Sequence, residues 1–277
     1  MSASTTLAGS MATPDSIPPH ININSNVDND IDKHNPDSDD SDSDTESITD
    51  NALWIEGDFI LISSDNTRFR IQSFHLYAAS RVFQDAKSLA VGELKLHLTD
   101  PTTENADTIH HFLRLITSGN GLGYKYPDAW IGLEKAVNLV AFLKKWESKA
   151  ALNSVAYQAH QILSDHGISR MDFFILGAVL DDPYFCSKVL KSTPQSYQSS
   201  LGGPKSWETK ALVDGRGDAD TADPTALPYD TWLLIPPDYY WALVRAWGES
   251  TGNKSNLAIR FLKLIQAVKS QKLHAAP

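Results

Sequence analysis

The chain has 277 residues, of which 42% are hydrophobic and 21% are charged, which is typical of a globular protein with one or two cores. Its one cysteine, Cys186, excludes an internal disulfide, and no apolar run approaches the ~20 residues needed to span a bilayer. Residues 1–16 lack the basic and apolar segments of a secretory signal, so we expect a protein of the cytoplasm or the nucleus that does not contact membranes.

The net charge of −10 is concentrated in the first 50 residues. The chain holds 34 acidic and 24 basic residues, and residues 1–50 contain 11 of the acids but only one base, Lys33. The remainder therefore carries 23 acids and 23 bases, so it has no net charge. A body without net charge is not expected to bind nucleic acid directly, and the alternative is a local basic patch.

Residues 1–50 contain no aromatic residue and are rich in Ser, Thr, Asp, Asn and Pro. Such a segment cannot bury enough apolar area to offset the entropy of ordering, so we predict a disordered acidic leader. Ser41 and Ser43 each have an acidic residue three positions later, as in acidophilic kinase sites. Phosphorylation would add about −1.5 to −2 charges per site. The alternative is an unmodified solubilising tail.

A β-hairpin is predicted after the leader. Residues 59–62 form a short apolar run typical of a strand buried on both faces, and residues 68–71 alternate polar and apolar side chains. Turn-forming residues at 64–66 lie between them. Residues 20–50 offer no apolar strand, so we expect no N-terminal strand that could be exchanged between subunits.

Two short helices, a strand and a longer helix follow in the prediction. Ser73 and Ser80 are placed to cap the short helices, and the first puts Phe74 on a face with Tyr77 and Ala78. Leucines alternate with polar residues at 94–98, as in a half-buried strand. Apolar residues with helical spacing at 109–116 then lead to Gly119. The predicted order is therefore β-β-α-α-β-α.

Helical periodicity dominates the rest of the chain. A capping box at 169–172 and the pair Asp182-Pro183 mark two helix starts. Residues 192–228 form a long polar insertion that we expect to be poorly ordered in part. The predicted helices cover about 133–145, 152–163, 170–180, the residues from 183, 232–247 and 256–269.

Candidate catalytic residues are few. Ser250 lies in a G-x-S-x-G pattern, but a nucleophile elbow needs a preceding strand and an aromatic-rich helix is predicted there instead, which favours a loop at a helix end. Cys186 lies among apolar residues and is predicted to be a buried, inert thiol. His110 and His111 are adjacent and so point in different directions on a helix. We expect no enzyme, no metal and no cofactor.

Tryptophans and tyrosines gather near the C-terminus, and we predict that most of them are core residues. The alternative for part of the cluster is an exposed groove for a partner, since aromatic residues carry much of the energy of interfaces. The cluster comprises Trp232, Tyr239, Tyr240, Trp241 and Trp247.

The order and spacing of residues 58–119 resembles the BTB/POZ domain, a protein-docking fold. Gln72 stands where that family usually has histidine, so a charged pocket at this place is not expected. The strand at 94–98 with its acidic stop and the helix ending at Gly119 also match. The positions that carry the resemblance are Asp58, Phe69, Gln72, Leu76, Ser80 and Phe83.

The resemblance implies an α+β fold, with a small mixed sheet flanked by helices in a BTB/POZ domain at 51–165 and an all-helical region at 166–277. Segments near 173–186 and 236–247 are similar to fungal BTB-domain proteins of unknown role. The family implies a non-enzymatic interaction module that forms a homodimer and recruits another protein.

Two alternatives follow from the same family: a substrate adaptor of a cullin-type ubiquitin ligase, and a cofactor of a transcriptional regulator. Cullin-docking members often carry an apolar-x-Glu motif, which Val91-Gly92-Glu93 fits. Glycine is a poor helix former, so we favour the interpretation of these residues as the loop into the next strand.

Overall fold

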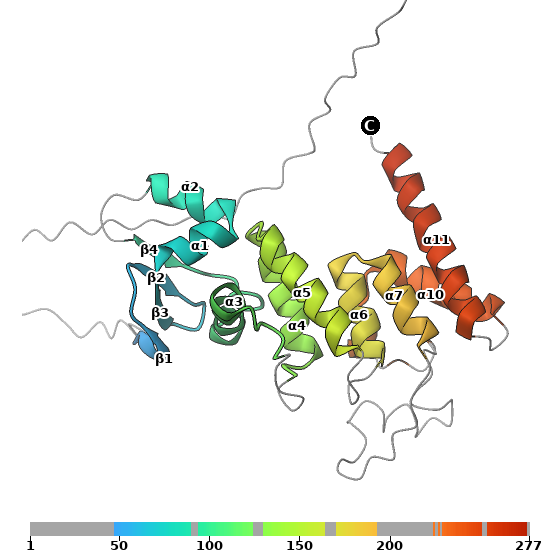
Figure 1. Ribbon diagram of the computed structural model, residues 1–277, viewed down its shortest axis with the longest axis horizontal. Helices are drawn as coiled ribbons and strands as arrows, with labels where there is room; N and C mark the ends of the chain where they lie inside the picture. Colours follow the sequence, from blue (N-terminus) through green and yellow to red (C-terminus); the bar gives the residue numbers. More distant parts are fainter. Residues whose placement is uncertain are drawn as a thin grey trace, which may run out of the picture.

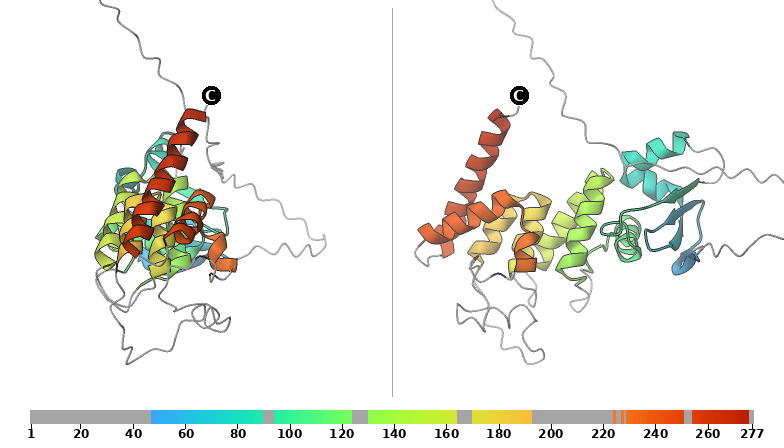
Figure 2. Two further views of the ribbon diagram at one scale, coloured as in Figure 1. Left: turned by 90° about the vertical axis from the view of Figure 1, so that its right-hand side faces the viewer. Right: turned by 180° about the vertical axis from the view of Figure 1, so that it is seen from behind.

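The computed structural model describes residues 47–89, 94–123, 130–163, 170–192, 224, 227, 229–250 and 254–275. It is elongated, with a small sheet at one end and the C-terminal helices at the other (Figures 1 and 2). The α+β class is confirmed, and helices predominate.

The sheet has the strand order β1-β3-β2-β4. β2 (Phe59–Ile62) and β3 (Thr67–Ile71) form the predicted antiparallel hairpin, while β4 (Leu94–His97) runs parallel to β2. Asn66 in the turn has a φ of 58°, a left-handed conformation that asparagine tolerates. The alternating side chains of the strands place Phe59, Leu61, Phe69 and Leu96 in the core.

The edge strand β1 (Thr49–Ile55) was not predicted, and it pairs in parallel with β3 of the same chain. The predicted leader boundary at residue 50 is therefore wrong, because the strand already begins at Thr49. The sequence of this strand shows no alternation of apolar and polar residues that would predict a buried face, because most of its apolar side chains face solvent. Residues 1–46, which are most of the predicted disordered leader, lie outside the described residues.

Three helices complete the sheet end: α1 (Ser73–Ala79), α2 (Arg81–Leu89) and α3 (Ala106–Ser118). The end of α3 at Gly119 is confirmed, with a φ of 70° that glycine adopts without strain. The face of α1 predicted from its spacing, formed by Phe74, Tyr77 and Ala78, is not the buried face, because the buried residue of this helix is Leu76.

Four helices follow: α4 (Leu133–Lys145), α5 (Lys149–Ile162), α6 (Arg170–Leu180) and α7 (Pro183–Lys191). The predicted start of α7 is confirmed: the Asp182 carboxylate accepts from the Phe185 amide at 2.8 Å, and Pro183 is the first helical residue. A Cβ on Gly177 would lie 2.7 Å from the Phe185 ring, so this glycine allows α6 and α7 to approach closely. The Ser169 end of the predicted capping box lies outside the described residues.

The C-terminal end contains α9 (Tyr229–Leu233), α10 (Pro237–Glu249) and α11 (Lys254–Ala275). The single helix predicted at 232–247 is wrong, because prolines at 236 and 237 break it. Pro237 is the first residue of α10, where proline is tolerated. Nearly all of the predicted insertion at 192–228 lies outside the described residues.

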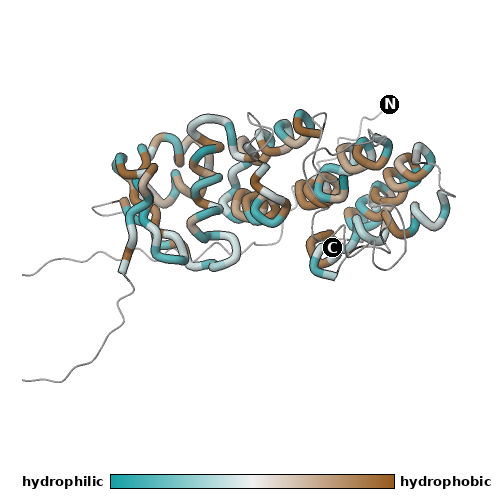
Figure 3. The backbone as a smooth tube through the Cα atoms, turned by 90° about the horizontal axis from the view of Figure 1, so that it is seen from below, coloured by the Kyte–Doolittle hydropathy of each residue, from teal (hydrophilic) through white to brown (hydrophobic). Residues whose placement is uncertain are grey.

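One continuous core joins the sheet end to the C-terminal helices. It runs from Phe59 in β2 through Phe142 in α4 and Phe174 in α6 to Phe261 in α11. Figure 3 shows hydrophobic residues recurring along the helices at both ends. Because the core is continuous, the two predicted halves of the chain pack as one body.

Candidate interaction site

Three of the positions that suggested the BTB/POZ resemblance are core residues. Phe69, Leu76 and Phe83 are fully buried. The Phe83 ring stacks against Trp146, with ring centroids 4.7 Å apart, and against Phe112 at 6.0 Å. These side chains therefore hold the fold together and offer no surface to a partner.

Asp58 caps helix α1 from outside the helix. Its carboxylate accepts hydrogen bonds from the amide and from the hydroxyl of Ser73, both at 2.7 Å. Gln72 occupies the N-cap position, is exposed, and makes no capping bond with its side chain. The prediction that Ser73 is the cap is wrong, because Ser73 is already the first helical residue. A carboxylate here satisfies a helix amide and interacts favourably with the helix dipole.

We expect Asp58→Ala to lower the free energy of unfolding by about 1 to 2 kcal/mol, because two donors at the start of α1 lose their acceptor. Urea unfolding followed by circular dichroism measures the change. Asp58→Asn retains one acceptor oxygen and should lower the free energy of unfolding by less than Asp58→Ala does. An unchanged unfolding midpoint for Asp58→Ala would contradict the capping role.

Ser80 connects α1, α2 and the far end of α4. Its amide donates to the Leu76 carbonyl at 3.0 Å, which ends α1, and its hydroxyl accepts from the Phe83 amide at 3.4 Å, which opens α2. The same hydroxyl donates to the Trp146 carbonyl. The prediction that Ser80 caps the second helix is confirmed. Its contact with Trp146 adds a long-range role that sequence spacing did not suggest.

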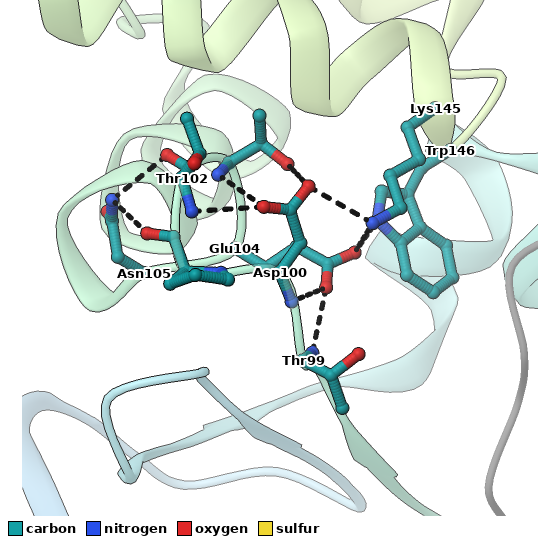
Figure 4. A network of polar contacts seen from close by, with 9 residues as sticks. Thr99, Asp100, Thr102, Glu104, Asn105, Lys145 and Trp146 are labelled. Atoms are coloured by element: carbon teal, nitrogen blue, oxygen red, sulfur yellow. Dashed lines mark hydrogen bonds and ion pairs between the residues drawn. The ribbon is translucent and has the colours of Figure 1, made fainter.

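A buried carboxylate, Glu104, ties the end of β4 to the end of α4 (Figure 4). One of its oxygens accepts from the amides of Thr99 and Asp100, both at 2.8 Å. The other accepts from the indole N–H of Trp146 at 3.0 Å and lies 2.9 Å from Lys145 Nζ. Sequence reasoning missed Glu104, since two of its partners lie more than 40 residues away.

Lys145 and Asp100 extend this network to the surface, with Nζ 3.4 Å from the Asp100 carboxylate. Partial burial alone would lower the pKa of Lys145, but the hydrogen bond and charge of Glu104 outweigh it and raise that pKa. Burial alone would raise the pKa of Asp100, but hydrogen bonds from Thr103 and from backbone amides lower it. Both groups are therefore charged at neutral pH, as an ion pair requires.

The two adjacent histidines of α3 have different surroundings. His110 Nδ1 accepts a hydrogen bond from the indole N–H of Trp54 at 3.3 Å, which ties β1 to α3. Burial, and then the charge of His110, lower the pKa of His111 to about 4, so its imidazole is neutral at physiological pH. Within the described residues, no group of three or more His, Cys, Asp or Glu is placed to hold a metal ion.

The two candidate nucleophiles lie in structural positions. Ser250 ends helix α10, is buried, and donates from its hydroxyl to the Trp247 carbonyl at 3.1 Å. A helix and not a strand precedes it, as predicted, so the turn of a nucleophile elbow is not formed there. The Cys186 thiol is fully buried, lies 3.4 Å from the Phe174 carbonyl, and has a pKa raised by burial. The prediction of a buried thiol is confirmed.

The aromatic cluster near the C-terminus is divided between core and surface. Tyr239 is buried and donates to the Asp181 carboxylate at 2.9 Å. By contrast, Trp232 is 36% exposed and Trp241 is 48% exposed. Tyr240 and Trp247 are partly buried and pack against the core, so together with Tyr239 three of the five members belong to it, and the prediction that most of this cluster is core is confirmed. The buried face of α10 is formed by Tyr239 and Leu243 with two alanines, which turns Trp241 outward.

Exposed apolar side chains of α9 and α10 form a surface that we call the aromatic patch. The Trp232 ring stacks on Tyr229 and meets Tyr240 edge to face, with centroids 5.6 Å apart in both pairs. These contacts bring α9 against α10. The members of the patch are Tyr229, Trp232, Leu233, Trp241 and Val244.

Strand β1 and helix α1 lie at the end of the molecule opposite α10 (Figure 1), and we call their exposed apolar side chains the sheet-end patch. Leu53 and Ile55 on the edge strand β1 are 73% and 61% exposed, and Phe74 on α1 is 61% exposed. Single exposed apolar residues are ordinary, but gathered ones mark interaction surfaces.

The remaining predicted sites are outside the described part of the chain. The possible cullin-docking residues Val91 and Glu93 fall in the gap at 90–93, and the possible phosphorylation sites Ser41 and Ser43 precede residue 47. None of the described helices is both long and apolar enough to cross a membrane. Comparison of the chain with family models, curated proteins and solved structures finds no significant match.

Proposed function

We propose that this chain is a non-enzymatic docking protein of the BTB/POZ type, working in the cytoplasm or nucleus. It self-associates through the sheet-end patch and recruits a partner protein through the aromatic patch. The observation that carries the proposal is the exposure of apolar side chains at both ends of one continuously packed body. Such a body keeps one docking surface free while the other is occupied.

The BTB/POZ part of the proposal is supported by topology. A hairpin of β2 and β3, two short helices, a strand parallel to the first one of the hairpin, and a helix ending at Gly119 follow one another in the order that the resemblance implies. Fold alone does not define a function, so the exposed surfaces carry the rest of the argument.

Self-association is assigned to the sheet-end patch because a two-fold dimer buries the same surface on both subunits. Leu53 and Ile55 lie on an edge strand, whose outer backbone groups can also pair with another strand. Phe74 on α1 is also exposed at this end of the molecule and is an aromatic side chain, the kind of residue that dominates interface energies.

Light scattering after size-exclusion chromatography of the full chain should give a mass twice that of one chain, independent of concentration. Leu53→Glu/Phe74→Glu should give the mass of a single chain, because charged groups are costly to bury in an interface. Tyr157→Glu is the matched control, since Tyr157 is 65% exposed on α5 and belongs to neither patch. A single-chain mass for the unchanged protein at tens of micromolar would refute self-association.

A further inference from the structure

The face of the sheet that points away from the core is basic. Strand register places Arg70 and Lys95 on either side of Ile60, and Arg68 and His97 on either side of Ile62. Strands β3 and β4, on either side of β2, thus gather basic residues that are far apart in sequence. We call this surface the basic face, and its charged and titratable members are Arg68, Arg70, Lys95 and His97.

The orientation of this face follows from the pleat. Phe59 and Leu61 belong to the main core, so Ile60 and Ile62, which alternate with them on β2, point the other way. Both isoleucines are nevertheless buried, at 4% and 0% exposed, and neither belongs to the main core. Long basic side chains commonly cover apolar neighbours with their aliphatic stems while their charged ends stay in water.

Most of the positive charge on the basic face is uncompensated. Arg68 forms a double hydrogen bond with Asp50 of β1, at 2.5 and 2.7 Å. Arg70 and Lys95 make no ion pair within the described part of the chain. Burial lowers the pKa of His97, and the nearby charge of Lys95 lowers it further, with no acidic group opposing them.

The acidic leader enters the sheet at the edge of this face. Residues 37–46 contain six acids in ten positions, and only two residues separate them from the start of β1. Asp50, at the beginning of β1, already pairs with Arg68 in the way that the preceding acids would pair with the other cations. Residues 37–46 therefore carry charge of the sign that the basic face lacks.

The distances allow this contact. Three strand spacings of about 4.8 Å make the sheet about 14 Å wide. Ten residues can extend to about 33 Å, so residues 37–46 can cross from β1 to β4 with chain to spare. Tethering also gives the leader an effective concentration of about millimolar, enough to populate a weak ionic contact.

We infer that residues 37–46 of this chain lie across the basic face and bind it through ion pairs with Arg70 and Lys95. The basic face is thus a site for acidic peptides whose resident ligand is the chain's own leader. This inference is independent of the proposed function. Phosphorylation of Ser41 or Ser43 would tighten the contact by adding negative charge, and an outside ligand must be more acidic than the leader to displace it.

Paramagnetic relaxation in the full chain tests the contact. Ser38→Cys introduces a thiol that a nitroxide maleimide modifies in the native protein, while the fully buried Cys186 is protected. Amide signals of residues 68–71 and 94–97 should lose intensity at low ionic strength. In 1 M salt, where the Debye length is about 3 Å, the intensity should return.

Variants of the leader and of the basic face separate the contribution of charge from that of tethering. A chain with the six acids of residues 37–46 replaced by Asn and Gln carries the same label and leaves every described residue unchanged, so its intensities measure proximity due to tethering alone. In Arg70→Glu/Lys95→Glu the amide signals should keep their intensity at low ionic strength. If this charge reversal prevents folding, Arg70→Gln/Lys95→Gln takes its place. The matched control Lys149→Glu/Lys263→Glu changes the net charge equally at exposed sites on α5 and α11. Its amide signals should lose intensity at low ionic strength as in the unchanged chain.

Three results would overturn the inference. Equal intensities with the acidic and the neutral leader would mean that charge does not hold the leader in place. A loss that persists when Arg70 and Lys95 are replaced would place the leader elsewhere. A mixed sample contains some chains that carry only the nitroxide label and others that carry only the isotope. If the loss of amide intensity appears only in such a sample, the leader binds a second copy of the chain.

Discussion

Replacing Phe83 by alanine is expected to lower the free energy of unfolding by about 3 to 5 kcal/mol. The ring is fully buried and is held between Trp146 and Phe112, with Phe59 meeting it edge to face at 6.3 Å. This one ring thus contacts the sheet, α3 and the end of α4 at once. The cavity left by the ring would therefore loosen several elements together.

Urea denaturation gives this value from the shift in midpoint, provided that the slope of the transition is unchanged. Tyr157→Ala is the matched control, because it removes an aromatic side chain that is 65% exposed on α5 and belongs to neither patch. It should change the free energy by no more than about 0.5 kcal/mol. Equal losses for the two variants would mean that Phe83 is not a core residue.

Glu104→Ala should cost about 3 kcal/mol, because it leaves two backbone amides and the Trp146 indole N–H without their acceptor in a buried site. Lys145 contributes less to this loss, since a third of its side chain is exposed and water can replace the lost carboxylate. Glu104→Gln retains one acceptor oxygen, so its free energy of unfolding should lie between those of the unchanged protein and of Glu104→Ala.

A double-mutant cycle with Lys145→Ala separates the ion pair from the neutral hydrogen bonds. We expect a coupling energy of about 1 kcal/mol or less, with most of the Glu104 effect remaining in the Lys145→Ala background. Glu134→Ala, an exposed acid in the first turn of α4, serves as the control. A coupling as large as the whole Glu104 effect would show that the ion pair, and not the amide cap, dominates.

Sequence reasoning succeeded where neighbouring residues determine the structure. The hairpin of β2 and β3, the end of α3 at Gly119 and the start of α7 at Asp182-Pro183 each depend on a few adjacent side chains and their backbone preferences. The burial of Phe69 followed from the alternation within its strand, whereas Leu76 and Phe83 were singled out by the family resemblance and not by helical spacing.

It failed where distant segments decide the outcome. Strand β1 exists because it pairs with β3, and its exposed apolar residues follow no pattern of burial. Glu104 looks like any acid before a helix until the end of α4 covers it. The basic face was equally hidden, because Arg70 and Lys95 become neighbours only when β2 lies between their strands. The surface exposure of Trp241 depends on which side of α10 meets α11 and could not be read from helical spacing alone.

During synthesis, Glu104 leaves the ribosome 42 residues ahead of Trp146. At about 5 to 20 residues per second, that interval lasts about 2 to 8 s. Until it ends, the nascent sheet end lacks the indole that covers the Phe83 ring, and one Glu104 oxygen lacks its two partners, Lys145 and Trp146. The translating chain therefore presents an incomplete apolar surface that a chaperone can bind, and it can complete this half of the molecule only after α4 has emerged.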